Sequence, residues 1–355
     1  MYEYSHGGNA NFEPGKENII DLSANVNSLG LPAKVTDAII REIPNITSYP
    51  DSFSIALRGK TAAFEGVTPH WVIFGNGASD LIFRLPRAIG ANKIMVCAPT
   101  FADYERSALS YGAEVCHYFT SKDKGFGLDE DFIKTVEETK PKLVYVCNPN
   151  NPTGRLTGAG LIKKLLDCCQ HIDAWVAIDE CFIDFAREGK ANTSKVFLKD
   201  YANLIILKAF TKMFAIPGVR LGYALCSNET MISSLYFHGT DWAVSNLAQA
   251  AGIAALDGGE IFVAQTVAYV EKERKVVADG LASLGYSVFE SSANYIFFQS
   301  PFSFDLRSAL DTKGIRIRSC GNYHGLDGTF YRVAVSTAEN NKKFLDAIKE
   351  ISIGR

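Results

Sequence analysis

The sequence predicts an α/β protein whose main sheet is largely parallel. Short apolar runs alternate with longer amphipathic stretches through the middle of the chain, and such alternation is typical of strand–helix–strand units. Most of the short runs are apolar at consecutive positions, as strands covered by helices on both faces require. At 355 residues, the chain is long enough for two or three domains, each with its own core.

The expected elements follow this alternation through the first two thirds of the chain. The predicted strands are 71–74, 94–97, 143–147, 175–178, 204–207 and 222–225. The predicted helices between them include 78–89, 104–111 and 158–170. Residues 1–45 show no strand–helix unit of their own, and we therefore expect this arm to pack with the small domain and the active site.

The last third differs in pattern and predicts a smaller α+β domain. A long helical pattern covers about 258–284, and a final helix is expected over 339–351. The strand-like runs between these helices are 287–290, 294–299, 315–318 and 330–335. We therefore expect three parts: the N-terminal arm (1–45), a large domain (46–235) and a small C-terminal domain (236–355).

Composition narrows the classes of function. The chain has 36 Lys and Arg and 39 Asp and Glu, for a formal net charge of −3. This balance excludes a strongly basic nucleic-acid binder. No run approaches the roughly 18 apolar residues of a membrane span, and no signal peptide is visible. The eight cysteines include no CxxC pair, which is typical of reduced, buried thiols. We expect a cytoplasmic enzyme without a metal, a membrane partner or a nucleic-acid partner.

A glycine-rich turn, GNGASD at 75–80, follows one predicted strand and opens a predicted helix. Glycines there allow the backbone N–H groups of Gly77, Ala78 and Ser79 to approach an anion at the helix N-terminus. An ordinary strand-to-helix turn is equally consistent with this segment alone. It matches neither the dinucleotide pattern GxGxxG nor the P-loop, so it does not favour a dinucleotide or ATP.

Polar residues also follow two further strands. NPNNPTG (148–154) comes directly after the apolar run 143–147, and it favours a rigid turn at the strand's carboxyl end, where open α/β sheets bind ligands. Asp179 and Glu180 close the next strand, and a carboxylate there must be paired or hydrogen-bonded. A simple loop breaker and a helix cap are the structural alternatives for these two segments.

The segment FTKMFAIPGVRLGY (210–223) carries Lys212 and Arg220 just after another predicted strand. A lysine in a partly buried site has a depressed pKa and can form a Schiff base with an aldehyde. A lone lysine is more often a solvated surface residue, so this segment matters only in combination with the others.

Together these segments supply what pyridoxal phosphate (PLP) requires of a protein. They offer a phosphate cradle, a partner for the ring nitrogen, a donor to the ring hydroxyl and a lysine for the aldehyde. Because all of them follow strands of one predicted sheet, we expect them to converge on one crevice.

These motifs resemble a known family. NPNNPTG, Asp-Glu after a strand, and Thr-Lys followed by Pro-Gly-x-Arg-x-Gly are similar in order and spacing to fold-type I PLP enzymes of the histidinol-phosphate aminotransferase group. Over practically the whole chain, the sequence more closely resembles the threonine-phosphate decarboxylases of that group. The motifs that carry this likeness are HGGN (6–9), DLSANVNSLG (21–30), YPD (49–51), DECFIDF (179–185), SANYIFF (292–298) and IRSCGNYHGLDGTFYRVAV (317–335). The resemblance implies a large domain with a seven-stranded, mainly parallel sheet.

The resemblance also implies roles for residues of a cofactor site. Lys212 would hold the cofactor as a Schiff base, Asp179 would bind and keep protonated the ring nitrogen, and both are the candidate catalytic residues. Asn151 would donate to the ring hydroxyl oxygen, and Phe101 would stack on the ring. The cofactor phosphate would be held by Gly77, Ala78, Ser79 and Arg220, and by Tyr49 from the second copy of a homodimer with shared active sites.

The implied substrate is a small phosphorylated amino acid. Arg318 and Arg332 offer planar, bidentate donors that suit a carboxylate or a phosphate; an ion pair within the small domain is their structural alternative. In this family the N-terminal motifs close over the substrate phosphate. The candidate substrate-binding residues are therefore His6, Asn9, Asn27, Asn151, Arg318 and Arg332.

The implied reaction is decarboxylation of L-threonine O-3-phosphate to (R)-1-amino-2-propanol phosphate and CO₂, for the side chain of cobalamin. An aminotransferase of the histidinol-phosphate type is the first alternative, because both enzymes need the same cofactor residues. A non-catalytic binding module is the second. Phe182, where aminotransferases often carry Tyr, favours the decarboxylase. Three positions depart from the family pattern: Lys208, Ala209 and Ser336.

Overall fold

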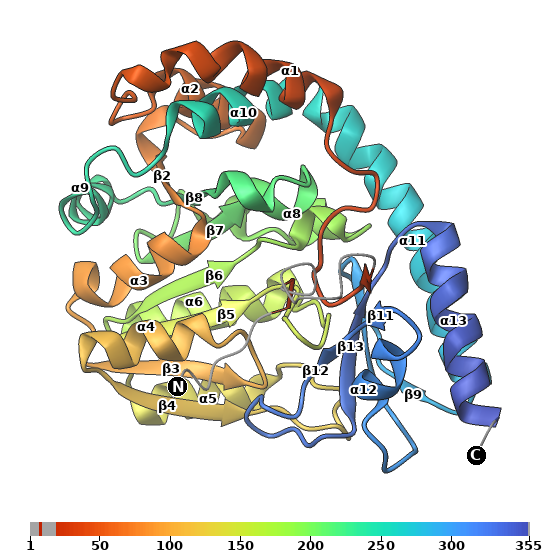
Figure 1. The fold of residues 1–355 in the computed structure, drawn as a ribbon. Helices are drawn as coiled ribbons and strands as arrows, with labels where there is room; N and C mark the ends of the chain where they lie inside the picture. Colours follow the sequence, from red (N-terminus) through yellow and green to blue (C-terminus); the bar gives the residue numbers. More distant parts are fainter. Residues whose placement is uncertain (1–6, 9–18, 354–355) are drawn as a thin grey trace.

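The computed structural model describes residues 7–8 and 19–353, and a seven-stranded sheet forms its centre (Figure 1). The strand order is β2-β8-β7-β6-β5-β3-β4. The strands are β2 (Val72–Asn76), β3 (Lys93–Ala98), β4 (Glu114–Phe119), β5 (Leu143–Cys147), β6 (Trp175–Asp179), β7 (Leu204–Ala209) and β8 (Leu221–Leu225). Only β8 runs antiparallel to its neighbours, so the predicted α/β fold with a mainly parallel sheet is confirmed.

Helices cover both faces of this sheet. Residues of each strand alternate between two buried clusters; in β2, for example, Ile73 faces one cluster while Val72 and Phe74 face the other. On the Ile73 side lie α3 (Ala78–Ile89), α4 (Asp103–Tyr111) and α9 (Glu229–Phe237). The opposite side carries α5 (Glu130–Thr139) and α6 (Ala159–His171). This two-sided burial is why most of the strands have consecutive apolar residues.

A second group of strands forms a smaller sheet. Its order is β12-β13-β10-β9, and every pair is antiparallel. The strands are β9 (Ser287–Val288), β10 (Tyr295–Gln299), β12 (Arg318–Ser319) and β13 (Phe330–Ala334). The helices around it are α11 (Gly259–Ser283), α12 (Leu306–Asp311) and α13 (Ala338–Ile353). In Figure 1 this part lies beside the carboxyl end of the large sheet.

The N-terminal residues contact both parts of the molecule. β1 (Ile20–Asp21) pairs in parallel with β11 (Ile315–Arg316) of the C-terminal third. α1 (Ala33–Glu42), which the sequence analysis missed, packs against α10 (Asn246–Leu256) at the top of Figure 1, and α10 also packs against α2 (Ile55–Glu65). The predicted boundaries of the three parts remain a prediction.

Short elements complete the chain: α7 (Gly189–Asn192) and α8 (Phe210–Met213), together with several 3-10 turns. Among the described helices, none alone is long and apolar enough to cross a membrane. One pair, α10 and α11, bent by 75° at its break, passes that test together. All eight cysteines are free thiols.

A buried ion cluster fixes the strand that leads to Lys212. Lys208 in β7 lies 2.9 Å from Oε1 of Glu65 and 3.1 Å from Oδ2 of Asp184. Lys195 Nζ lies 2.5 Å from the other Glu65 oxygen. Burial alone would raise the pKa of Glu65, but the attraction of Lys208 and Lys195 outweighs it and lowers that pKa to about 2. The cluster therefore ties the end of α2 to the core of the large sheet.

Glu65→Gln should lower the free energy of unfolding by about 3 kcal/mol or more, because the positive charge of buried Lys208 would lose its closest partner. A carboxyl with a depressed folded pKa stabilises the protein above its unfolded pKa, and this contribution is lost as pH falls toward the folded value. Between about pH 4.5 and pH 2, the variant should therefore lose less stability than the native chain. Urea unfolding at neutral and acidic pH measures both effects. Glu271→Gln, at an exposed pair with Arg187, is the control and should change little; equal effects of the two variants would contradict the prediction.

Candidate active site

The predicted functional segments meet at one edge of the large sheet. β3, β5, β6 and β7 are parallel, so their carboxyl ends lie at the same edge. β2 also ends there, because it is antiparallel to β8, which is itself antiparallel to β7. For the same reason β8 begins at this edge, and Arg220 directly precedes it. The topology thus explains how distant segments reach one site.

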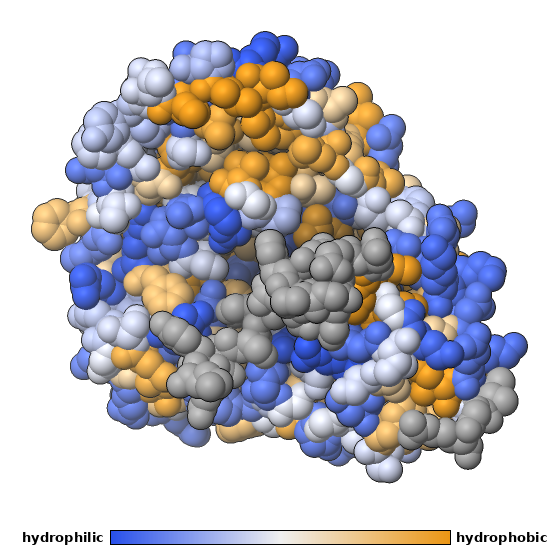
Figure 2. Space-filling view, viewed as in Figure 1, coloured by the Kyte–Doolittle hydropathy of each residue, from blue (hydrophilic) through white to orange (hydrophobic). Residues whose placement is uncertain are grey.

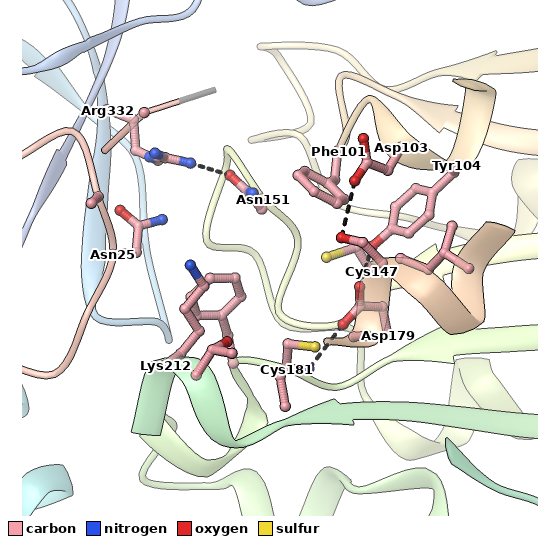
Figure 3. Close-up of a pocket in the computed structure, with 18 of the residues that line it drawn as sticks. Asn25, Phe101, Asp103, Tyr104, Cys147, Asn151, Asp179, Cys181, Lys212 and Arg332 are labelled. Atoms are coloured by element: carbon pink, nitrogen blue, oxygen red, sulfur yellow. Dashed lines mark hydrogen bonds between the residues drawn. The ribbon is translucent and has the colours of Figure 1, made fainter. Parts of the chain in front are cut away.

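A cavity of about 280 Å³ lies at this edge, between the large sheet and the smaller one (Figure 3). It brings together nine of the residues predicted from the sequence: Ala78, Ser79, Phe101, Asn151, Asp179, Lys212, Arg220, Arg318 and Arg332. Described residues that the sequence analysis did not select also line it, among them Ser23, Asn25, Asp103, Tyr104 and Tyr323.

Lys212 lies in the one-turn helix α8, directly after β7. Its amine points into the cavity toward Asn151 and Arg332 (Figure 3). Burial, reinforced by the positive charges of Arg332 and Arg220, lowers the pKa of Lys212 from 10.5 to about 8. A substantial fraction of the amine is therefore neutral, and nucleophilic, near neutral pH.

Asn27 holds the turn that carries Lys212 from outside the cavity. The Asn27 backbone N–H donates to the Lys212 carbonyl over 3.1 Å. The Asn27 side-chain amide donates to the Met213 carbonyl over 2.7 Å and to Thr266 Oγ1 over 2.8 Å. Asn27 was predicted to bind substrate, but the structure places it behind Lys212 rather than in the cavity lining, with its side chain bonded to protein groups.

Asp179 closes β6 on the opposite side of the cavity, and its two oxygens are held by different elements. Tyr104 Oη donates to Oδ2 over 2.7 Å, and the Cys181 backbone N–H donates to Oδ1 over 2.9 Å. The Tyr104 ring stacks on Tyr145 with centroids 4.9 Å apart. These contacts fix the orientation of the carboxylate. Neighbouring Glu180 has a structural role instead, since it accepts hydrogen bonds from Thr193 and Ser194.

The three asparagines of NPNNPTG divide into two structural residues and one that faces the cavity. Asn148 bonds the backbone of Thr157 with both its amide and its oxygen. Asn150 donates to the Pro99 carbonyl over 3.0 Å and to Thr153. Only Asn151 lines the cavity. The loop-breaker interpretation therefore holds for part of the motif, and Asn151 remains the candidate ligand-binding residue.

The two predicted arginines enter the cavity from the smaller sheet, where β12 and β13 place Arg318 and Arg332 in register. Arg332 is buried, and it donates to Asn151 Oδ1 and, over 2.6 Å, to the Ser23 carbonyl. Both acceptors are neutral, and Arg332 Nε has no hydrogen-bond partner among the described residues. The guanidinium of Arg318 lies over the Tyr323 ring, 5.4 Å from its centroid.

The glycine-rich turn and Arg220 meet at the start of α3. Gly77 has φ +78°, and a Cβ atom there would lie 2.4 Å from Arg220 Nη2. A Cβ at Gly222 would lie 2.2 Å from the Ala78 backbone nitrogen. Only glycine at these two positions allows the arginine and strand β8 to approach the helix N-terminus so closely. Gly77 itself caps α3 without lining the cavity, and Ser79 Oγ donates to Asp103 over 3.1 Å.

Besides Asn27 and Gly77, three further predicted residues are not among the described lining residues. Tyr49 is 80% exposed, and its ring stacks on Trp242 with centroids 4.5 Å apart. His6 and Asn9 lie outside the described residues. The sequence analysis also missed Tyr104, although its position three residues after Phe101 in a helix that begins at the same sheet edge is the pattern that could have identified it.

Comparisons with known proteins identify the family of this chain. The family model for aminotransferase class I and II matches residues 17–348. A threonine-phosphate decarboxylase from Salmonella typhimurium is 31% identical over 100% of this chain and 98% of its own length. A histidinol-phosphate aminotransferase from Methanococcus aeolicus is 30% identical over 96% of this chain and 92% of its own. The crystal structure of the histidinol-phosphate aminotransferase from Clostridium acetobutylicum superposes with a TM-score of 0.88, at 28% identity, over 95% of this chain and 100% of that chain.

The fold is that of a fold-type I PLP enzyme. The chain belongs to the aminotransferase class I and II family, and its cofactor is pyridoxal phosphate.

The residues present fit that cofactor. Among the described residues that line the cavity, four are cationic (Lys212, Arg220, Arg318 and Arg332) and two are carboxylates (Asp103 and Asp179). Cationic side chains outnumber carboxylates in this described lining, and guanidinium groups bind carboxylates and phosphates well, so the cavity suits anionic ligands. The lysine has a lowered pKa, as an amine that must react with an aldehyde requires.

The lowered pKa of Lys212 can be measured on protein from which the cofactor has been removed. Acylation of Lys212, followed by peptide mass spectrometry, should be half-maximal near pH 8. Arg332→Gln should move this midpoint upward, because it removes a nearby positive charge. Arg187→Gln, at an exposed arginine on the surface pair with Glu271, should leave the midpoint unchanged. A midpoint at the value of an ordinary lysine in the native chain would contradict the assignment.

Proposed function

We propose that this enzyme decarboxylates L-threonine O-3-phosphate, releasing CO₂ and (R)-1-amino-2-propanol phosphate, the side-chain precursor in cobalamin synthesis. The observation that carries the proposal is the excess of cationic side chains around one cavity. The cofactor phosphate accounts for one anion. Two further buried arginines suit a substrate with both a carboxylate and a phosphate.

In this proposal the large sheet holds the cofactor. Lys212 would bind its aldehyde, Asp179 its ring nitrogen and Asn151 its ring hydroxyl, while Phe101 would cover the ring. The cofactor phosphate would lie at the N-terminus of α3, against Gly77, Ala78, Ser79 and Arg220. When bound, PLP withdraws electrons from the substrate's Cα and so weakens the bonds to that carbon. The Tyr104 and Cys181 contacts would keep Asp179 aimed at the ring nitrogen.

The smaller sheet would hold the substrate. Arg318 and Arg332 point into the cavity from neighbouring strands, and each can bind a carboxylate or phosphate through two parallel N–H groups. Arg332 now donates to neutral oxygens only, so an anion would be a stronger acceptor. We assign the same role to His6 and Asn9, and we assign Asn27 to positioning Lys212. By fixing the two anionic groups, the arginines would decide which bond of Cα is held in the reactive orientation.

Lys212 would also control the proton. Its pKa of about 8 allows Nζ both to carry and to release a proton near neutral pH. After CO₂ leaves, the Lys212 ammonium would deliver a proton to Cα, which balances the reaction. In an aminotransferase the same nitrogen would instead remove the Cα proton.

One position in the cavity supports the decarboxylase over an aminotransferase. Phe182 lines the cavity where aminotransferase relatives often carry Tyr, and its ring packs edge-on against Tyr295 at 5.1 Å. Two of the three departures from the family pattern have structural roles: Lys208 forms the Glu65 cluster, and Ser336 contacts Asn340 and Asn341 at the start of α13. Only Ala209 lines the cavity, so it removes one possible hydrogen bond to the cofactor phosphate.

The reaction can be tested directly with purified protein, PLP and L-threonine phosphate, without any keto acid. We expect CO₂ and aminopropanol phosphate in equal amounts, and a loss of about 10²–10⁴-fold or more in Lys212→Ala. Lys342→Ala, at an exposed lysine of α13, is the control for removal of a lysine. No CO₂, together with amino transfer from histidinol phosphate once 2-oxoglutarate is supplied, would refute the decarboxylase and establish the aminotransferase.

We also propose a homodimer with shared active sites. Apolar side chains gather on one face, over α1, α2 and α10 at the top of Figure 2. The exposed ones include Leu31, Ile40, Ile43, Ile46, Phe53 and Ile55. A contiguous apolar surface of this kind is typical of an interface. Tyr49 lies at the same end of the molecule, outside its own cavity and 80% exposed, so it could reach the cofactor phosphate of a second copy.

Mixed dimers test this arrangement. Tyr49→Ala and Lys212→Ala should each reduce activity as pure dimers. Mixing the two after reversible dissociation should restore part of the activity, because one site of each mixed dimer would then contain both native residues. Light scattering would give the mass of the native particle. A monomer, or a mixture no more active than its components, would contradict shared sites.

A further inference from the structure

A second, smaller cavity of about 50 Å³ lies beside the first. The two share Phe101, Arg318 and Tyr323 in their linings. Three potential metal ligands line the second cavity: Glu105 from α4, His117 from edge strand β4, and His324 from the segment after β12. None of these residues has a part in the proposed reaction.

The donor atoms of these three residues converge. His324 Nε2 lies 3.0 Å from Glu105 Oε2, and His117 Nε2 lies 3.6 Å from Glu105 Oε1. The two imidazole rings are 4.7 Å apart, centroid to centroid. One donor atom from each residue lies within 4.8 Å of the other two. Around an ion with bonds of about 2.0–2.1 Å, tetrahedral ligand atoms would be roughly 3.3 Å apart, so small side-chain movements suffice.

We propose that Glu105, His117 and His324 form a site for a divalent transition-metal ion, with Zn²⁺ as the best match. Two imidazoles and one carboxylate are a ligand set typical of zinc, and three protein ligands leave a fourth position for water. His324 is 56% exposed in its side chain, so an ion can enter from solvent.

A simple histidine–glutamate contact explains these residues less well. The 3.0 Å approach of His324 to Glu105 is an ordinary hydrogen bond. His117, however, points its buried Nε2 at the same carboxylate from beyond hydrogen-bond distance, and that atom has no hydrogen-bond partner among the described residues. A buried polar atom without a partner is costly, and a metal ion between the three groups would satisfy it.

Because of the position of the site, a bound ion would affect the surrounding structure. His324 follows Asn322 and Tyr323, which both contact Arg318: Arg318 Nη2 donates to Asn322 Oδ1 over 2.9 Å, and its guanidinium lies over the Tyr323 ring. Glu105 and His117 belong to the large sheet and its helices. An ion bound here would therefore fasten the 320–328 segment across the two parts of the protein, and Arg318 would be positioned with it.

The first test uses the full-length holoenzyme and Zn²⁺ alone. Equilibrium dialysis should give one specifically bound ion per chain. Glu105→Gln, His117→Ala and His324→Ala should each weaken binding by more than about 100-fold, since even loss of a supporting contact costs 10–100-fold. His171→Ala, at the exposed end of α6, is the matched control and should bind normally. His324 is mostly exposed, so its variant should fold even if His117→Ala does not.

Two further measurements locate the ion without using activity. Anomalous scattering at the zinc edge should place it between the three side chains, and Zn²⁺ should raise the unfolding midpoint of the native chain but not of His324→Ala. No specific binding, binding equally strong in Glu105→Gln and His324→Ala, or an ion located in the main cavity would overturn the proposal. Because these readouts need no turnover, the result does not depend on whether the enzyme decarboxylates or transaminates.

Discussion

The imbalance of charge in the main cavity is the constraint on which the rest of the site depends. Lys212, Arg220, Arg318 and Arg332 converge there, and the described lining residues include two carboxylates, Asp103 and Asp179. Bringing cations together in a partly buried space costs free energy that the fold must supply elsewhere. Burial, together with the repulsion from Arg332 and Arg220, lowers the pKa of Lys212, and the excess of positive charge favours the binding of an anionic ligand.

Several contacts outside the cavity keep these charges in place. The Glu65–Lys208 cluster fixes β7 just before the Lys212 turn, and Asn27 fixes the same turn from behind. Tyr104 fixes Asp179 in the same way. Each of these contacts joins segments far apart in the sequence, so the precision of the site depends on the packing of the whole large sheet and not on the catalytic loops alone.

The cavity lies between two sheets that contribute different groups to it. The large sheet presents the groups suited to the cofactor, at the carboxyl ends of its parallel strands. The smaller sheet presents two arginines on adjacent strands. A change in the relative position of the two sheets would move the arginines relative to Lys212. In the proposed reaction, this would alter which bond of the substrate's Cα is oriented for cleavage. The cluster of Glu105, His117 and His324 spans the same boundary, which places a potential metal ion where it could influence this geometry.

The sequence by itself determined the fold class and nine of the residues that line the cavity. Consecutive apolar residues reveal a strand buried on both faces, and most of the six strands predicted in the large sheet have this pattern. β4 escaped detection because it is an edge strand, only partly buried, with Glu114 and His117 among its apolar residues. α1 was missed although its apolar residues recur at helical spacing; its partner α10, more than 200 residues away in the sequence, could be found only from the structure.

Only the tertiary structure decided which polar residues face the cavity. Asn148, Asn150 and Asn151 are equivalent in the sequence, yet Asn148 bonds the backbone of Thr157, Asn150 bonds the Pro99 carbonyl of another loop, and Asn151 lines the site. Asn27 likewise belongs to a motif expected at the substrate but lies behind Lys212. Motif and spacing determine which segments reach the sheet edge, because strand direction is a local property. The direction of each side chain depends on partners supplied by distant segments, and those partners exist only once the chain has folded.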